Sequence, residues 1–205
     1  MIKISDAKVY NFDDAIYGMR SPHRSWDKID SYFNGVDYVI GPNDLGLMQR
    51  LYKAGPEHRK FGRQIFVSFR EITAPLYWWK EMETYKIGVD SDSTSTMHSI
   101  QYKEFDFDDF SCEHLNERSY IKLANTIKEL NFNRKMYLET GDIEYWWQMI
   151  QLLPTPYNQM RTITMNYEVV FNIIHQRTGH RLDEWKVMVD TLKHLPYVRQ
   201  IMEVE

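Results

Sequence analysis

The alternation of apolar and polar positions predicts two strands in the first part of the chain. Residues 3–12 alternate with a period of two, and residues 63–72 are rich in β-branched and aromatic side chains. A helix between them is indicated by apolar residues at helical spacing, namely Leu45, Leu47, Met48 and Leu51. We expect Asn43 to cap this helix and Gly55 to end it. Residues 13–33 mix short-helix and loop signals.

Another helix is expected directly after the second strand. Thr73 can cap it, and Pro75 suits its first turn because a missing N–H costs nothing there. The stretch 85–98 then lacks apolar periodicity of either kind, so we predict a loop. Residues 104–114 are acidic and are expected to be exposed.

The C-terminal half has the pattern of a series of helices. Apolar residues at spacings of three predict a helix from about residue 116, and Gly141 ends it before Asp142 caps the next helix. The stretch 154–164 is expected to be a loop, and two further helices follow it. No Gly/Ser-rich linker or repeat divides the chain. We therefore predict an α+β fold, a helix-rich single domain of residues 1–205 with a small mixed or antiparallel sheet.

The composition fits a folded protein and restricts its partners. The 205 residues are 43% apolar and 15% aromatic, which suits a dense core or an aromatic-lined pocket. The net charge of −4 and the pI near 6.0 argue against general nucleic-acid binding, although a local basic pocket is compatible with both. Because the sequence has no long apolar run and no signal-peptide pattern at its N-terminus, we expect a cytoplasmic protein without a membrane partner.

Cysteine and histidine usage argues against several kinds of site. The single Cys112 excludes an internal disulfide and a multi-cysteine zinc site, and Glu113 beside it disfavours a nucleophilic thiolate by like charge. The histidines have no metal-ligand spacing, so we expect no metal, although His58, His98 and His175 could approach a site. The common dinucleotide, Walker, zinc-protease and serine-hydrolase signatures do not occur.

A dense run of hydroxyl side chains in the 85–98 stretch is the first candidate for binding chemistry. These hydroxyls and the backbone N–H groups beside them could surround a phosphate as neutral donors, whereas Asp90 and Asp92 would repel it. The alternative is a solvated polar loop. The hydroxyls belong to Ser91, Ser93, Thr94, Ser95 and Thr96.

Two further groups of polar residues lie near the C-terminus. Asn166 and Arg177 are separated by eleven positions, so they project about 20° apart on one helix face. They could border a ligand, or they could be a capping asparagine and an arginine that complements the helix dipole. The loop before this helix offers donor-rich side chains that suit a base or a phosphate, unless it is only a rigid connection: Tyr157, Asn158, Gln159 and Arg161.

Several segments of the sequence occur in the same order as the motifs of the flavin-dependent thymidylate synthases. The chain resembles that family over residues 55–190. EHRKF at 57–61 is similar to a Glu-His pair before a strand, and residues 72–87 are similar to a helix that ends in an Arg-His-Arg motif. Residues 88–98 take the place of a small polar turn, and residues 151–185 resemble a Leu-Pro loop followed by a Thr-x-Asn helix. The resemblance implies a flavin-dependent thymidylate synthase-like fold and methylation of dUMP without a cysteine nucleophile.

The resemblance also implies roles for individual residues. His58 would face the flavin, and Thr84, Tyr85 and Lys86 would stand in place of the Arg-His-Arg motif, so that only a lysine keeps the charge. With Lys80 as a substitute cation, the residues implied in cofactor binding are His58, Lys80, Tyr85, Lys86 and Asn166. Those implied in substrate binding are Ser91, Ser93, Thr94, Ser95, Thr96, Arg161 and Arg177. No catalytic side chain is identified, and Glu168 replaces a common second arginine.

Two functions follow as alternatives. In the first, FAD reduced by NADPH relays a one-carbon unit from a methylene folate to C5 of dUMP or a related pyrimidine nucleotide. In the second, a non-catalytic relative binds a nucleotide or a protein, because each lost arginine removes a phosphate contact of about 1.5–3 kcal/mol. The resemblance also implies a homotetramer. Two groups look exposed enough for subunit contacts, although core packing would explain them as well: Trp78–Trp79 and Tyr145–Trp147.

Overall fold

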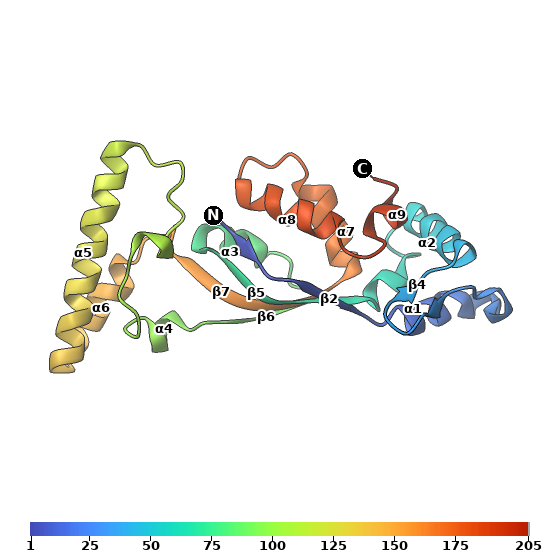
Figure 1. Ribbon diagram of the computed structural model, residues 1–205, viewed down its shortest axis with the longest axis horizontal. Helices are drawn as coiled ribbons and strands as arrows, with labels where there is room; N and C mark the ends of the chain where they lie inside the picture. The colour runs from blue at the N-terminus through green and yellow to red at the C-terminus, as the bar shows by residue number, and fades with distance from the viewer. Residues whose placement is uncertain (205) are drawn as a thin grey trace. The chain divides into compact units, whose positions relative to one another are not determined.

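The computed structural model describes residues 1–204, and its strands form a five-stranded sheet and a separate hairpin (Figure 1). The sheet has the order β1-β5-β7-β6, with β2 also paired to β5. Lys3 of β1 lies opposite Thr73 of β5, and Ala7 of β2 lies opposite Phe69, so both N-terminal strands are antiparallel to β5. The sheet strands are β1 (Lys3–Ile4), β2 (Ala7–Tyr10), β5 (Phe66–Pro75), β6 (Val89–Ser93) and β7 (Asn158–Asn166). The hairpin strands are β3 (Tyr32–Phe33) and β4 (Tyr38–Val39).

The chain divides into two compact units, each assembled from separate stretches. Strands β5, β6 and β7 contribute residues to both units. Unit 1 consists of Met1–Ile4, Glu71–Thr84 and Asp92–Thr162. Unit 2 consists of Ser5–Arg70, Tyr85–Ser91 and Ile163–Glu205.

A helical hairpin forms much of unit 1. Helix α5 (Glu117–Thr140) ends at Gly141, whose φ of 70° is left-handed, and Asp142 then caps α6 (Ile143–Leu152) by accepting from the N–H of Glu144. The two helices pack on each other and bury an apolar cluster with residues of the preceding segment: Ile100, Phe105, Phe110, Leu123, Ile127, Leu130 and Met149. The remaining helical elements are α3 (Leu76–Met82), α4 (Thr96–Ser99) and a 3₁₀ turn, Phe107–Asp109.

Two expectations of exposure in unit 1 are wrong. Trp78 and Trp79 are buried and pack against each other with ring centroids 4.8 Å apart, so they belong to the core rather than to a surface. The acidic stretch 104–114 buries Phe105 and Phe110, while most of its carboxylates stay exposed. Trp147, by contrast, is 42% exposed.

Helices of unit 2 come from both ends of the chain. Helix α2 packs against α9, and α7 packs against α8. Their common core contains several of the largest buried side chains, Tyr167, Phe171, Trp185, Ile16 and Met48. The helices are α1 (Phe12–Arg20), α2 (Pro42–Ala54), α7 (Tyr167–Arg177), α8 (Asp183–Lys193) and α9 (Val198–Met202), with 3₁₀ turns at Ser21–His23, Trp26–Lys28 and Lys60–Arg63.

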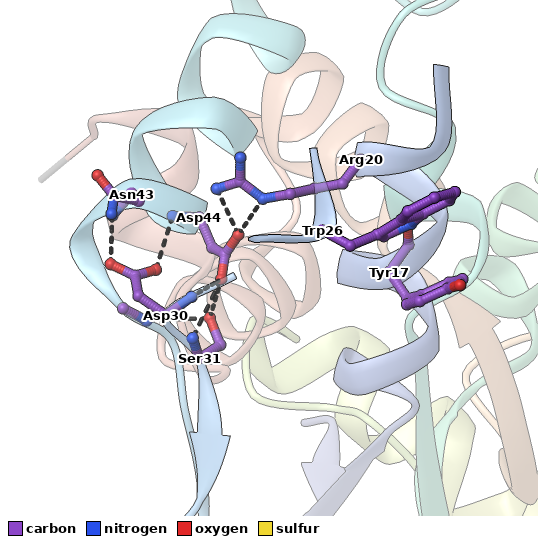
Figure 2. A network of polar contacts seen from close by, with 8 residues as sticks. Tyr17, Arg20, Trp26, Asp30, Ser31, Asn43 and Asp44 are labelled. Carbon is purple, nitrogen blue, oxygen red and sulfur yellow. Dashed lines mark hydrogen bonds and ion pairs between the residues drawn. The ribbon is translucent and has the colours of Figure 1, made fainter. Parts of the chain in front are cut away.

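A buried carboxylate joins three segments of unit 2 (Figure 2). Asp44 is fully buried, and its Oδ1 lies 2.7 Å from Nε and 2.6 Å from Nη2 of Arg20, which is also buried. Its Oδ2 accepts hydrogen bonds from the N–H of Asp30 at 3.0 Å and from the N–H and hydroxyl of Ser31 at 3.1 and 2.7 Å. Since a buried charge is tolerated only when it is paired and hydrogen-bonded, this set of partners fixes α1 and residues 30–31 against α2.

The start of α2 differs from the sequence prediction. Asn43 does not cap the helix, because Asp30 from another segment takes that role by accepting from the N–H groups of Asn43 at 2.8 Å and Asp44 at 3.1 Å. Partial burial opposes the charge of Asp30, but these hydrogen bonds lower its pKa below the ordinary value. Thr73 is likewise no cap, since it lies inside β5.

Both stretches that were expected to be loops contain strands. Residues 89–93 form β6, which is an edge strand and mostly exposed, so its aspartates and serines show no apolar alternation. Ser95 then caps the short helix α4. Residues 158–166 form β7, where Gln159, Ile163 and Met165 point inward, and the buried glutamine hides the period of two.

The other main expectations are confirmed. Helices α5 and α6 follow the predicted caps at Gly141 and Asp142, the strand expected at 63–72 is β5, and the α+β class with a mainly antiparallel sheet is observed. Within residues 1–204, none of the helices combines the length and apolar character that crossing a membrane requires.

Replacing Asp44 by asparagine should strongly destabilise the protein. The Asp44→Asn amide removes the negative charge from buried Arg20 and turns an N–H₂ group toward donors, so we expect a loss of about 3–5 kcal/mol in the free energy of unfolding. Urea titration followed by circular dichroism measures it. Asp14→Asn, an exposed change on α1, should stay within about 0.5 kcal/mol. A similar small effect of Asp44→Asn would contradict the role assigned to the pair.

Candidate functional site

Arg177 lies among aromatic rings at the end of α7. Its Nε donates to the hydroxyl of Tyr85 at 3.0 Å, and that hydroxyl donates to Oε1 of Gln176 at 2.9 Å. The guanidinium carbon is 4.5 Å from the ring centroid of Trp185 and 5.6 Å from that of Tyr85. Stacking and hydrogen bonding therefore hold the arginine in one orientation, with its charge partly shielded from solvent.

Strand β6 meets helix α7 through a glycine and an asparagine. The carbonyl of Gly88 accepts from the N–H of Asn166 at 3.0 Å, and a Cβ at Gly88 would lie only 2.4 Å from Nδ2 of Asn166. Gly88 also has a φ of 84°, which L side chains rarely adopt. Oδ1 of Asn166 accepts from the N–H of Val169 at 3.0 Å, so Asn166 is the cap of α7.

The structure thus brings the first part of the 85–98 stretch next to the Asn166–Arg177 helix within unit 2. Tyr85 contacts Arg177, and Gly88 contacts Asn166. Ser91 also belongs to unit 2 and is exposed, with its N–H bonded to Oδ1 of Asp90 at 3.0 Å. Two of the groups singled out from the sequence are therefore in contact, through Tyr85 and Gly88.

The remaining hydroxyls of the stretch belong to unit 1, where several serve local structure. Thr94 donates to the carbonyl of Met160 at 3.2 Å. The hydroxyl of Ser95 accepts from the N–H of His98 and lies 2.8 Å from Nδ1 of that ring. Ser93 is exposed and Thr96 begins α4. The bonds of Thr94 and Ser95 account for those two hydroxyls without a ligand.

Arg161, a predicted substrate residue, is engaged within unit 1. Its Nη1 lies 2.7 Å from Oε1 of Glu83, its Nε donates to Oε1 of Gln159 at 3.0 Å, and its guanidinium carbon is 4.5 Å from the ring centroid of Trp79. Nε2 of Gln159 in turn donates to the carbonyl of Thr94 at 2.8 Å. The charge of Arg161 is therefore paired, and the arginine links β7 to α3.

The three residues in place of the Arg-His-Arg motif have different surroundings. Thr84 turns its hydroxyl back to the carbonyl of Glu81 at 2.8 Å, and Tyr85 makes the contacts described above. Lys86 is exposed, as is Lys80 on α3. Of the three, only Lys86 presents a cation to solvent.

A cavity of about 530 Å³ in unit 2 has His58 in its wall. Its charged and titratable lining is mainly basic, whereas Glu57 is its one carboxylate, 3.8 Å from Nε2 of His58. Arg20 also reaches the cavity, but Asp44 balances its charge. Such a cavity falls within the size range of small-molecule sites and favours an anionic ligand. The other basic lining residues are His23, Lys28, Arg50 and Lys60.

None of these four residues is predicted from the sequence to belong to a site. A weak signal was present, because RSPHRSWDK at 20–28 and EHRK at 57–60 are both rich in basic side chains. Neither segment showed a clear element, so their approach to Arg50 on α2 could not be inferred.

At the position where the family resemblance implies an arginine, Glu168 supplies a carboxylate that pairs with Arg59. Glu168 accepts from Nε of Arg59 at 2.9 and 3.1 Å, and Nη2 of Arg59 donates to Oδ1 of Asn172 at 3.2 Å. The guanidinium also lies 5.0 Å from the ring centroid of Tyr52. The positive charge thus comes from the loop before β5 rather than from α7.

Cys112 is unsuited to nucleophilic chemistry. Burial raises the pKa of its thiol, and the negative charge of Glu113 raises it further. The thiolate that would attack a substrate is therefore disfavoured.

Solved structures share this fold at low sequence identity. A flavin-dependent thymidylate synthase from Helicobacter pylori, complexed with FAD and dUMP, matches with a TM-score of 0.67 and 17% identity over 98% of this chain and 96% of that one. The UMP/dUMP methylase PolB from Streptomyces cacaoi, bound with 5-Br dUMP, matches with a TM-score of 0.65 and 12% identity over 99% and 93%. No protein-family model and no curated protein matches the sequence. The chain has the fold of the flavin-dependent thymidylate synthases.

Proposed function

We propose that this protein transfers a one-carbon unit to C5 of dUMP or a related pyrimidine nucleotide with the help of FAD. The observation that carries the proposal is the basic cavity at His58, in a chain with this fold. His58 is the residue that the resemblance assigns to the flavin, and the basic side chains around it suit a phosphorylated, planar ligand.

The donors of the cavity suit a flavin nucleotide, whereas Thr84, which lies outside the cavity, does not. Lys28, Arg50 and Lys60 can donate to phosphates, and His58 offers a ring for stacking. Thr84 does not suit a phosphate, because its hydroxyl is bonded within its own turn. The cavity therefore replaces part of the positive charge that the missing Arg-His-Arg motif would supply.

The chain's own residues would bind and orient the reactants. In this proposal His58, Tyr85, Lys86 and Asn166 hold the cofactor, and Ser91 and Arg177 hold the substrate, all within unit 2. Thr94, Ser95 and Arg161 of unit 1 are engaged with partners of their own. FAD, when bound, supplies the redox step, with NADPH and a methylene folate as co-substrates. Arg177 is prearranged by Tyr85 and Trp185, which lowers the entropy lost when a phosphate is bound. We extend the proposal to a homotetramer, with exposed Trp147 as a candidate contact.

One observation favours a second function, nucleotide binding without turnover. Thr84 stands where the resemblance implies an arginine, carries no charge and donates its hydroxyl to the carbonyl of Glu81 at 2.8 Å, so a flavin lacks a phosphate contact there. A protein with such a site could keep a nucleotide and lose the flavin.

Reconstitution with FAD separates the two functions. The proposed enzyme should retain a yellow flavin through gel filtration and should oxidise NADPH faster when dUMP and a methylene folate are present. Absorbance spectroscopy measures both. Nucleotide binding by calorimetry without bound flavin would support the second function, and binding of neither ligand would contradict both.

The basic cavity gives a matched test of cofactor binding. Lys28→Ala/Lys60→Ala removes two donors, each worth about 1.5–3 kcal/mol to a phosphate, so FAD affinity should fall at least about tenfold. Lys122→Ala/Lys128→Ala makes the same change in net charge on the exposed side of α5 and should leave FAD affinity unchanged. Fluorescence titration of FAD compares the variants. An equal loss of FAD affinity in the two double variants would contradict a role of this cavity in FAD binding.

The contact between Tyr85 and Arg177 predicts a smaller effect. Tyr85→Phe removes the hydroxyl that accepts from Arg177, so the arginine loses its fixed orientation and dUMP should bind about threefold to tenfold more weakly. Tyr102→Phe, at a residue 77% exposed, is the control. Calorimetric titration with dUMP gives both affinities. Unchanged binding by Tyr85→Phe would exclude Arg177 from the nucleotide site.

A further inference from the structure

Unit 2 contains a second cavity, of about 880 Å³, whose lining differs from that of the His58 cavity. It lies where β2, the start of α1, the β3–β4 hairpin and the segment before α9 meet, and the two cavities share no lining residue. Its aromatic lining residues are Tyr10, Phe12, Phe33, Tyr38 and Tyr197. Its other residues include Val9, Val36, Pro196 and Gln200, with Asp13 and Asp37 as the charged members.

The aromatic rings form a partly exposed wall. Phe12 stacks on Tyr38 with ring centroids 6.0 Å apart, and Tyr197 meets Phe12 edge-on at 5.8 Å. Phe33 is 64% exposed and Tyr10 is 50% exposed, so much of the apolar wall is open to solvent. The face of an aromatic ring carries a negative potential that attracts a cation.

The cavity carries negative charge only. Asp13 and Asp37 line it, and no Lys, Arg or His does so among residues 1–204. Both aspartates are exposed, and neither forms an ion pair in the part of the chain that is described. Burial raises the pKa of Tyr38, and the charges of Asp13 and Asp44 raise it further, so the phenol stays neutral. A phosphorylated ligand would be repelled here, whereas a cation would be attracted.

The walls are held in place before any ligand binds. The hydroxyl of Tyr197 accepts from the N–H of Ile40 at 3.0 Å and donates to the carbonyl of Tyr38 at 3.2 Å. These bonds tie the segment before α9 to the β4 strand of the hairpin. A site formed in advance loses less conformational entropy on binding.

We propose that this cavity binds a small organic cation, a quaternary or tertiary ammonium compound, with its charge against the rings and near Asp13 and Asp37. The aromatic rings attract the cation through their π faces, and the two carboxylates attract it over a longer distance. The site goes beyond the proposed nucleotide chemistry, because that chemistry uses anionic ligands at a separate cavity. The result of testing this cation site is therefore independent of whether the proposed nucleotide function is correct.

The test compares a cation with a neutral compound of the same shape. Full-length protein is titrated with choline and with 3,3-dimethylbutan-1-ol by ligand-observed NMR at fixed ionic strength. Choline should bind saturably, and the neutral alcohol should bind at least about tenfold more weakly, because the charge provides the attraction.

Matched variants locate the site. Asp13→Asn/Asp37→Asn and, separately, Phe33→Ala should each weaken choline binding about threefold or more, and both changes lie on exposed side chains. Asp14→Asn/Asp27→Asn changes the net charge equally outside the cavity and should leave binding unchanged. Equal affinity for choline and the alcohol, an equal loss in the control pair, or no saturable binding would each overturn the proposal.

Discussion

The buried charge of Asp44 is the constraint on which unit 2 depends. A carboxylate with no access to water needs a cation and several donors, and here these come from Arg20 at the end of α1 and from residues 30–31. Helix α1 lines both cavities, one through Phe12 and Asp13 and the other through its C-terminal turn. Asp44 thus holds a helix that contributes to the walls of both cavities.

The linings of the two cavities carry charges of opposite sign although both cavities lie in one unit. Lysines, arginines and histidines surround the first, whereas aromatic rings and two aspartates surround the second. A protein with a net charge of −4 can therefore attract an anion at one place and a cation at another, because local fields rather than the total charge decide what approaches. A ligand whose charge suits one cavity would be repelled by the charges that line the other.

The sequence predicted the elements whose signals are local. Gly141 and Asp142 end and begin helices through their own backbone and side-chain chemistry, so α5 and α6 were found correctly. The α+β class followed from the periodicity of apolar residues along the chain. Strands β6 and β7 were missed because an edge strand needs no apolar face and because Gln159 is buried in place of an apolar residue.

The candidate site was predictable only in part, for a different reason. The family resemblance pointed to Tyr85 and Asn166, and helical spacing pointed to Asn166 and Arg177. In the fold Tyr85 contacts Arg177, and Asn166 contacts Gly88. The basic cavity was not foreseen, since it gathers side chains from three segments that show no common period. Arg59 was missed as well, because its pairing with Glu168 depends on tertiary contact alone.

The tight contact between Gly88 and Asn166 has a mechanical consequence. Asn166 uses its backbone N–H to hold Gly88, the residue before β6, and its side-chain oxygen to hold the first turn of α7. Any movement that draws residues 85–91 away from α7 must therefore pull on the same residue that closes the helix end. Displacement of this segment and fraying of the helix would be one concerted event, and a ligand that restrains either of them would steady the other.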